Sequence, residues 1–152
     1  MGKPRPPRVA LIASEFNAPF PERLLAGALG RLKASGVPAS RIRVLRVPGA
    51  WEIPAVASAC ASCGAFDAVV ALGCILRGGT NHDEVIAHAV ARELQAIASR
   101  LGVPVGLGIV TARTLAQVRA RCRPGPDNRG AHAAEAALRT VEVVRRVRSG
   151  KA

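Results

Sequence analysis

The sequence predicts an α/β fold: a three-layer α/β/α sandwich with a central parallel sheet in a single domain. Short apolar runs rich in valine alternate with longer segments whose apolar residues recur at helical spacing. The resulting order, βαβαβαβαα, is typical of a parallel sheet with right-handed crossovers and helices on both faces, as in flavodoxin-like proteins. The length of 152 residues suits one domain with a sizeable core.

The elements follow from local patterns along the chain. Buried strands are expected at residues 8–14, 41–47, 68–72 and 103–110, because each is a short apolar run ended by polar or turn-forming residues. Helices are expected from Pro19 or Pro21 to a stop at Gly36, at 53–63, from Asp83 onward, at 115–121 behind Thr114, and at 131–148. The third helix carries one apolar stripe, formed by Val85, Ile86, Ala89, Val90, Leu94, Ile97 and Leu101. Residues 1–7 are expected to be an irregular proline-rich arm, residues 8–148 the domain, and residues 149–152 a tail.

Composition limits the classes of protein that fit this chain. Its formal net charge is +12, which attracts nucleic acid, anionic membranes or phosphorylated metabolites. The basic residues are scattered through many segments and no stacking aromatics lie between them, so we expect a solvated surface and no nucleic-acid partner. No membrane partner is expected either, because no apolar run approaches bilayer length and the first residues lack the core of a signal peptide. Four dispersed cysteines favour a cytoplasmic protein with reduced thiols.

The most informative stretch links the third strand to the third helix. Arg77, Gly78, Gly79, Thr80, Asn81 and His82 form a turn whose glycines let backbone approach a ligand closely. Thr80 or Asn81 can cap the helix, and the free N–H groups of its first turn favour an anion. We therefore expect a phosphate-bearing small substrate with His82 beside it for proton transfer. The alternative is an ordinary strand-to-helix turn in which His82 is a capping or surface residue.

Two further loops are expected at the same edge of the sheet. One carries Phe16 and the other carries Trp51 and Glu52. Aromatic rings at strand ends can stack on a flat heterocycle, and a carboxylate can bind its N–H or hydroxyl groups. Alternatively, both rings only plug the edge of the core.

Other motifs are not supported. Cys60 and Cys63 have the spacing of a redox or zinc half-site, but they lie at a helix C-terminus and no second pair completes a zinc site. His82 and His88 are six residues apart, so they lie on different faces of a helix and cannot act as a metal-binding pair. No phosphate loop or dinucleotide fingerprint is present, so no nucleotide cofactor is expected.

Taken together, these segments resemble the lumazine synthase (6,7-dimethyl-8-ribityllumazine synthase) family. The most specific matching pieces are the segments Val47-Pro-Gly-Ala-Trp-Glu-Ile-Pro54 and Ile75-Leu-Arg-Gly-Gly-Thr-Asn-His82. Further matches are Phe16-Asn17, Asp67-Ala-Val-Val-Ala-Leu-Gly73, Gly108-Ile-Val-Thr111 and Asn128-Arg-Gly130, in the family's order and spacing. The resemblance covers nearly the whole chain from Arg8 to the last helix.

The resemblance implies a transferase of riboflavin biosynthesis. It condenses 5-amino-6-(D-ribitylamino)uracil with 3,4-dihydroxy-2-butanone 4-phosphate, releasing phosphate and water, and needs no metal or redox cofactor. By carry-over, His82 is the catalytic proton-transfer residue. Carried-over contacts to the pyrimidine and ribityl chain are Phe16, Ala50, Trp51, Glu52, Cys74, Ile75, Leu76 and, from the next subunit, Leu107. Those to phosphate are Gly79, Thr80, Arg129 and, from the neighbouring subunit, Arg121.

The resemblance also implies an assembly. Family members form homopentamers with active sites shared between subunits, some of which build a sixty-subunit shell, and riboflavin synthase is the pathway partner. Pro4, Pro6 and Pro7 cannot donate the hydrogen bonds of an exchanged N-terminal strand, which favours a free pentamer. Departures from the family pattern are Trp51 for Phe, Asp83 for an aromatic residue, Leu107 for Phe, Arg129 for Lys and His88 for Glu.

Two rival functions stay open from the sequence. One is a lumazine- or flavin-binding protein that has lost catalysis, against which His82, Thr80 and Arg121 argue. The other is a basic structural or nucleic-acid-associated protein, which only the net charge suggests.

Overall fold

Four parallel strands form the central sheet of the computed structural model, which describes residues 4–151. They are β1 (Val9–Ser14), β2 (Ile42–Val47), β3 (Ala68–Leu76) and β4 (Val105–Ala112), in the spatial order β2-β1-β3-β4. Residues 1–3 of the expected arm and residue 152 of the expected tail lie outside the described residues, and residues 4–8 have no regular secondary structure. The predicted α/β fold with an all-parallel sheet is confirmed.

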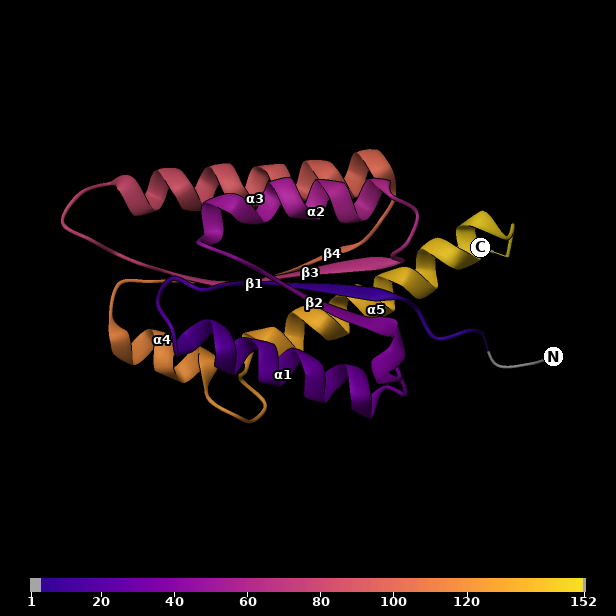
Figure 1. Ribbon diagram of the computed structural model, residues 1–152, viewed down its shortest axis with the longest axis horizontal. Helices are drawn as coiled ribbons and strands as arrows, with labels where there is room; N and C mark the ends of the chain where they lie inside the picture. Colours follow the sequence, from indigo (N-terminus) through magenta and orange to yellow (C-terminus); the bar gives the residue numbers. More distant parts are fainter. Residues whose placement is uncertain (1–3, 152) are drawn as a thin grey trace.

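Five α-helices cover the two faces of this sheet (Figure 1). Helices α2 (Ile53–Ser62) and α3 (His82–Leu101) lie on one face. Helices α1 (Phe20–Ala34), α4 (Leu115–Cys122) and α5 (Arg129–Arg148) lie on the other. Two short 3₁₀ turns, η1 (Ala39–Arg41) and η2 (Ala50–Glu52), flank β2 and were not predicted. No helix within residues 4–151 is both long and apolar enough to cross a bilayer.

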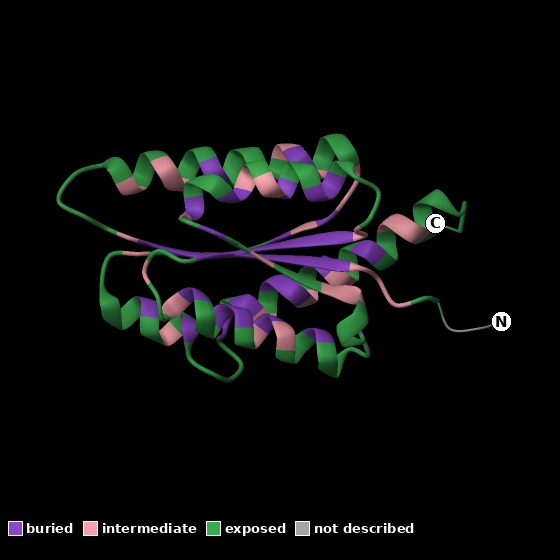
Figure 2. Cartoon of the chain, in the orientation of Figure 1, coloured by how far each residue is buried: buried purple, intermediate pink, exposed green. Residues whose placement is uncertain are grey.

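Successive residues of the inner strands fill two separate cores, one on each face. Leu11, Val70 and Leu72 pack against α1, α4 and α5, whereas Ile12 and Val69 pack against α2 and α3. Figure 2 shows the inner strands buried, with buried residues on the helix faces turned toward them. This burial on both faces explains why these strands are continuous apolar runs.

The structure corrects parts of the predicted elements. Strand β3 continues to Leu76, beyond the expected end at residue 72, because β4 pairs with it as far as Ala112. In the predicted stripe of α3, Val90, Leu94 and Ile97 are buried, but Val85 is 62% exposed and Leu101 40% exposed. Ala89 is exposed as well, whereas Ile86 and Ala87 pack against the core, so Val85 and Ala89 lie on the outward side of α3, outside the stripe that faces the sheet.

Helix α5 packs very closely on its neighbours. A Cβ atom at Gly130 would lie 1.9 Å from the backbone oxygen of Leu24 in α1, and one at Gly106 of β4 would lie 2.3 Å from that of Ala133. Glycine at these two positions lets α5 approach both α1 and the edge strand. The first turn of α5 therefore packs directly against α1.

An ion-pair cluster ties the arm to the sheet at the end opposite the loops described below. Asp67 accepts hydrogen bonds from the Arg8 backbone N–H at 2.7 Å and from the Arg8 guanidinium at 3.0 Å, and Arg145 lies 3.5 Å away. Burial alone raises the pKa of the Asp67 carboxyl. The hydrogen bonds and charge of Arg8, with the charge of Arg145, outweigh this effect and hold its pKa below the ordinary value of 3.8.

We expect the Asp67→Asn variant to melt at a lower temperature than the parent, with a difference that depends on pH. Because the folded-state pKa lies below the unfolded one, the carboxylate's contribution is fully present above about pH 4 and disappears as pH falls through the folded value. Circular dichroism melts from neutral to acid pH measure this difference. Asp127→Asn is the matched control, because Asp127 forms an exposed i,i+4 pair with Arg123. A constant difference at all pH values would contradict the assignment.

Candidate active site

Three loops are tied together at the carboxyl edge of the sheet, the first two by backbone hydrogen bonds and the third through a side chain. The N–H groups of Glu15 and Phe16 donate to the carbonyls of Val47 and Pro48, each at 2.9 Å, which joins the loop after β1 to the loop after β2. Asn17 donates through Nδ2 to the carbonyl of Cys74 at 2.9 Å, which joins the first loop to the end of β3. Asn17 has φ of 65°, a left-handed conformation that asparagine adopts more readily than most residues.

These loops enclose a hollow of about 370 Å³ at this edge. Its predicted lining residues are Phe16, Ala50, Trp51, Cys74, Ile75, Leu76, Thr80 and His82. Phe16 is 70% exposed and Trp51 58% exposed, so the alternative in which both rings plug the core is wrong. Two large aromatic rings facing an open hollow form a surface on which a flat ligand can stack.

The turn before α3 brings His82 to the rim of this hollow. His82 is the first residue of α3, and its backbone N–H lies 3.3 Å from Thr80 Oγ1. Asn81 occupies the N-cap position without a side-chain cap bond, so the first turn of this 20-residue helix retains N–H groups that can bind an anion. An imidazole and an anion-binding helix start therefore lie beside the two rings.

Two side chains affect the hollow in different ways, Glu52 from the loop beside it and Cys74 from its lining. Glu52 accepts a hydrogen bond from the Gly49 N–H at 2.9 Å, which fixes the loop that carries Trp51. Burial raises the pKa of the Cys74 thiol to about 11. Cys74 is therefore protonated at neutral pH and acts as an apolar lining residue, not as a nucleophile.

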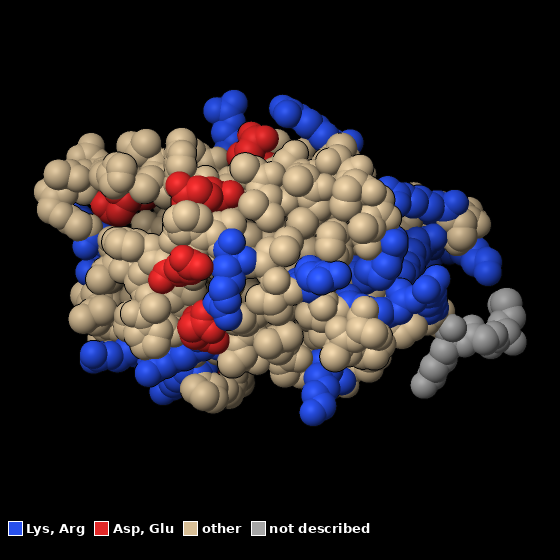
Figure 3. Space-filling view, in the orientation of Figure 1, with Lys and Arg blue, Asp and Glu red and all other residues tan. Residues whose placement is uncertain are grey.

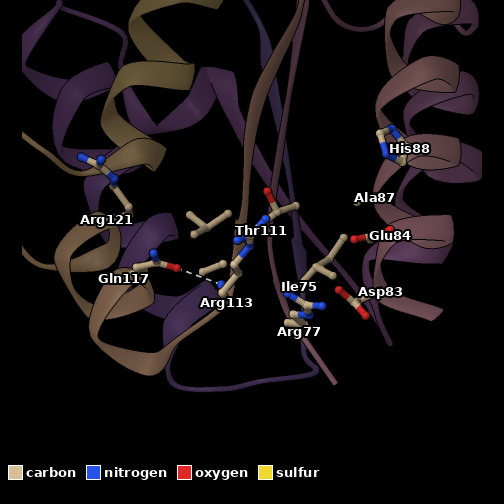
Figure 4. A pocket seen from close by; sticks show the side chains of 12 residues that line it. Ile75, Arg77, Asp83, Glu84, Ala87, His88, Thr111, Arg113, Gln117 and Arg121 are labelled. Atoms are coloured by element: carbon tan, nitrogen blue, oxygen red, sulfur yellow. Dashed lines mark hydrogen bonds between the residues drawn. The ribbon is translucent and has the colours of Figure 1, made fainter. Parts of the chain in front are cut away.

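A second hollow of about 580 Å³ lies between α3 and α4 across the end of β4 (Figure 4). The α3 side carries Asp83, Glu84 and His88, and the α4 side carries Gln117 and Arg121. The α3 wall thus holds two carboxylates and the α4 wall a guanidinium, and Arg77 and Arg113 line the hollow between them. Ile75 and Asp83 line both hollows, so the two share a wall.

The structure separates the predicted site residues into groups. Arg121 lines only the second hollow. Glu52, Gly79, Leu107 and Arg129 line neither hollow. Leu107 lies on the edge strand β4 and is 56% exposed, and Arg129 is exposed at the start of α5. One chain therefore does not bring the whole predicted set together.

Sequence reasoning missed several lining residues. Asn17, Asp83 and Ile86 border the first hollow but were not among the predicted contacts, although the loop that holds Asn17 was expected at this edge; Gly78, which also borders it, lies in the turn that was predicted to approach the ligand. Asn17 had a usable signal, because a polar residue directly after a buried strand often adopts a turn conformation. The side chain of Asp83 carried no such signal, because its place on the wall between the two hollows depends on where α3 begins.

An open parallel sheet with two aromatic rings, an imidazole and a helix N-terminus around one hollow at its carboxyl edge defines an α/β protein with a small-molecule site. The family described as 6,7-dimethyl-8-ribityllumazine synthase matches residues 6–145. The chain is 39% identical over 148 residues to 6,7-dimethyl-8-ribityllumazine synthase 1 of Caulobacter vibrioides, covering 97% of each chain. It is 44% identical over 131 residues to the 6,7-dimethyl-8-ribityllumazine synthase of Methylobacterium radiotolerans, covering 86% of this chain and 78% of that one. The chain belongs to the 6,7-dimethyl-8-ribityllumazine synthase family.

Proposed function

We propose that this chain is a lumazine synthase. It condenses 5-amino-6-(D-ribitylamino)uracil with 3,4-dihydroxy-2-butanone 4-phosphate in the penultimate step of riboflavin biosynthesis. The observation that carries this proposal is that Phe16, Trp51, Thr80 and His82 line one hollow at the carboxyl edge of the sheet. A flat pyrimidine needs an aromatic surface to stack on, and a phosphate ester needs an anion-binding helix start. The reaction requires the two next to each other.

The pyrimidine is bound at the aromatic side of the hollow. Phe16 and Trp51 stack on its ring, and Ala50, Cys74, Ile75 and Leu76 line the space beside it. Glu52 receives hydrogen bonds from the ligand through the carboxylate oxygen that Gly49 does not occupy. These contacts hold the substrate's amino group close to the ketone, which supplies much of the rate by positioning alone.

The reaction requires proton transfers at several steps. The amine adds to the ketone, water leaves as the imine forms, phosphate is eliminated, and the second amine closes the ring onto the remaining carbonyl with loss of a second water. His82 lies at the rim where these groups meet, and an imidazole can both accept and donate protons near neutral pH. We assign the proton transfers to His82.

The phosphate binds at the start of α3. The N–H groups of the turn that contains Gly79 and Thr80 face an anion favourably, because the helix dipole adds partial positive charge there. Arg121 and Arg129 line other surfaces of the same chain, so they complete the phosphate site from a neighbouring subunit. Leu107 reaches the ribityl-pyrimidine pocket in the same way.

Head-to-tail assembly accounts for this division of the site. The α3 wall of the second hollow is acidic and the α4 wall is basic, so the α4 side of one copy complements the α3 side of the next. Val85, Leu107 and Leu115 expose apolar side chains on α3, β4 and α4. A heterologous interface of this kind closes into a ring, and we propose the homopentamer that the family resemblance implies.

Light scattering distinguishes the possible assemblies. Five chains of 15.7 kDa come to about 80 kDa, and sixty come to about a megadalton. We expect the smaller mass. The carbonyls of Arg5 and Pro6 in the arm are bound by Arg145 and Arg41 of the same chain, at 2.8 and 2.9 Å, which opposes strand exchange. A monomer would contradict the shared site, and a megadalton particle would contradict the free pentamer.

The direct test of the activity mixes both substrates and follows the absorbance of the lumazine product. Product formation supports the enzyme. Tight binding of lumazine without turnover would indicate instead a binding protein that has lost catalysis. We place the enzyme in the cytoplasm, where its free cysteines stay reduced and riboflavin synthase consumes its product.

Arg121→Ala should raise KM for the phosphate substrate roughly tenfold or more with a smaller effect on kcat, because a charged hydrogen-bond donor contributes about 1.5–3 kcal/mol. Steady-state kinetics with varied phosphate substrate measures the change. Arg119→Ala is the matched control, because Arg119 is an exposed arginine on α4 that lines neither hollow. Equal KM values for the two variants would refute the assignment of Arg121.

A further inference from the structure

The fold gathers basic side chains at the edge of the sheet opposite the site. Arg41 ends η1, Arg43 lies at the start of β2, Arg100 in the last turn of α3, and Arg145, Arg146 and Arg148 in the last turn of α5. We call these six residues the basic edge. Figure 3 shows basic side chains concentrated toward the end of the molecule where both termini lie, and acidic side chains mainly on the other half of this face.

Hydrogen bonds between distant segments show that these residues are neighbours in space. Arg41 donates to the carbonyl of Pro6 at 2.9 Å, and Arg145 donates to that of Arg5 at 2.8 Å. Arg148 donates to the carbonyl of Gly102, directly after α3, at 3.1 Å. The arm, β2, α3 and α5 therefore meet at this edge, although their basic residues lie far apart in the sequence.

These contacts orient the guanidinium groups without neutralising them. Each of these contacts to a carbonyl uses one N–H donor, and a guanidinium carries five N–H donors and a permanent charge. Arg41 and Arg148 thus keep donors free to face outward while their side chains are already held in place. Arg43, Arg100 and Arg146 are exposed, and no hydrogen bond or ion pair engages their side chains within residues 4–151.

Nearby negative charge does not balance the basic edge. Asp67 already pairs with Arg8 and Arg145, and Glu142 lies one turn before Arg146 on α5. The C-termini of α3 and α5 also point here, but each helix end contributes only about half a negative charge. The proposed catalytic site lies at the other edge of the sheet, so its chemistry does not account for this excess either.

We propose that the basic edge binds the phosphodiester backbone of a nucleic-acid duplex without reading its sequence. Arginine pairs with phosphate oxygens through two parallel hydrogen bonds, and all six residues of the basic edge are arginines. The exposed rings Phe16 and Trp51 lie at the opposite edge, so this surface does not offer them for stacking on single-stranded bases or for anchoring in a membrane. From the scatter of basic residues along the sequence we expected no nucleic-acid partner; the fold leaves most of the 22 basic residues dispersed but brings these six to one edge.

The test measures binding of the full-length protein to a fluorescein-labelled DNA duplex by fluorescence anisotropy over a range of salt concentrations. Arg100→Glu/Arg146→Glu should weaken binding about tenfold or more at about 0.1 M salt, and it should flatten the dependence of affinity on salt, because fewer counterions are released. The control is Arg92→Glu/Arg119→Glu. It changes the net charge equally, at exposed arginines outside the basic edge. Both double variants should form the same oligomer and keep lumazine synthesis, so a failure of this proposal leaves the enzyme assignment intact.

Several outcomes of the binding experiment would overturn the proposal. Equal weakening by the two double variants would overturn the proposal, because net charge alone would then explain the attraction. Tighter binding to poly-glutamate, or to phosphatidylglycerol vesicles, than to the duplex would overturn it in favour of an acidic protein or a membrane. A second duplex of different sequence, and an RNA duplex, should bind within a few-fold of the first. A strong preference among them would contradict backbone recognition.

Discussion

Replacing His82 by alanine should lower kcat for lumazine formation about a hundredfold, while the protein stays folded and assembled. General acid–base catalysis by one side chain contributes on the order of 10²–10⁴-fold. Positioning by the stacked rings and the phosphate site remains in the variant, so the loss is incomplete. Steady-state kinetics with both substrates, together with a circular dichroism melt, measures the effect. His82 is exposed at the start of α3, so its removal costs little packing.

Chemical rescue separates the proton-transfer role of His82 from a positioning role. Added imidazole should restore part of the rate of the His82→Ala variant, because the small base can occupy the vacated space beside the substrate. A rate equal to that of the parent would remove His82 from the mechanism. A slow variant whose KM rises without any rescue would indicate that the ring only binds substrate.

The largest effect on stability is expected from Asn128→Ala. The side chain of Asn128 is buried, and its Oδ1 accepts from the Ala131 N–H at 3.0 Å, which caps α5. Its Nδ2 lies within 3.0–3.3 Å of the carbonyls of Arg23, Cys122 and Arg123. Alanine removes the cap and leaves buried carbonyls without their donor, which we expect to lower the free energy of unfolding by about 3 kcal/mol. Urea denaturation measures the loss.

Asn81→Ala is the matched control for this variant. Asn81 occupies the same N-cap position on α3, but its side chain makes no capping bond. Its replacement should change the free energy of unfolding by less than about 0.5 kcal/mol. If Asn128→Ala cost no more than Asn81→Ala, the network around Asn128 would not hold α1, α4 and α5 together as described.

The sequence carried enough information for most of the fold, because local patterns determine it. The run from Ala68 to Leu72 is buried on both faces, and this burial requires apolar residues at every position. The stops at Gly36 and Gly64 were predictable, because both adopt positive φ after a helix. Val85 and Ala89 were predicted wrongly because apolar residues at helical spacing can also lie beside the buried stripe of a helix, on its outward side.

The site was predictable in part. The edge at which Phe16, Trp51 and His82 meet follows from the rule that parallel strands end together. The distribution of residues between the two hollows was not predictable, because it depends on the depth of the loops and on the closeness of α3 and α4. The role of Asn128 was missed because it depends on a contact between distant segments. Its Nδ2 donates to the carbonyl of Arg23, which lies 105 residues away in the sequence.

Main-chain hydrogen bonds join the loops after β1 and β2, so the residues that line this pocket can change during evolution while the loops stay connected. The links from Glu15 and Phe16 to the segment after β2 use only main-chain atoms. The rings at positions 16 and 51 can therefore be exchanged for others without loosening the frame that presents them. Ligand preference and architecture are thus largely independent here, which leaves the two aromatic positions open to evolutionary drift or to redesign for other heterocycles.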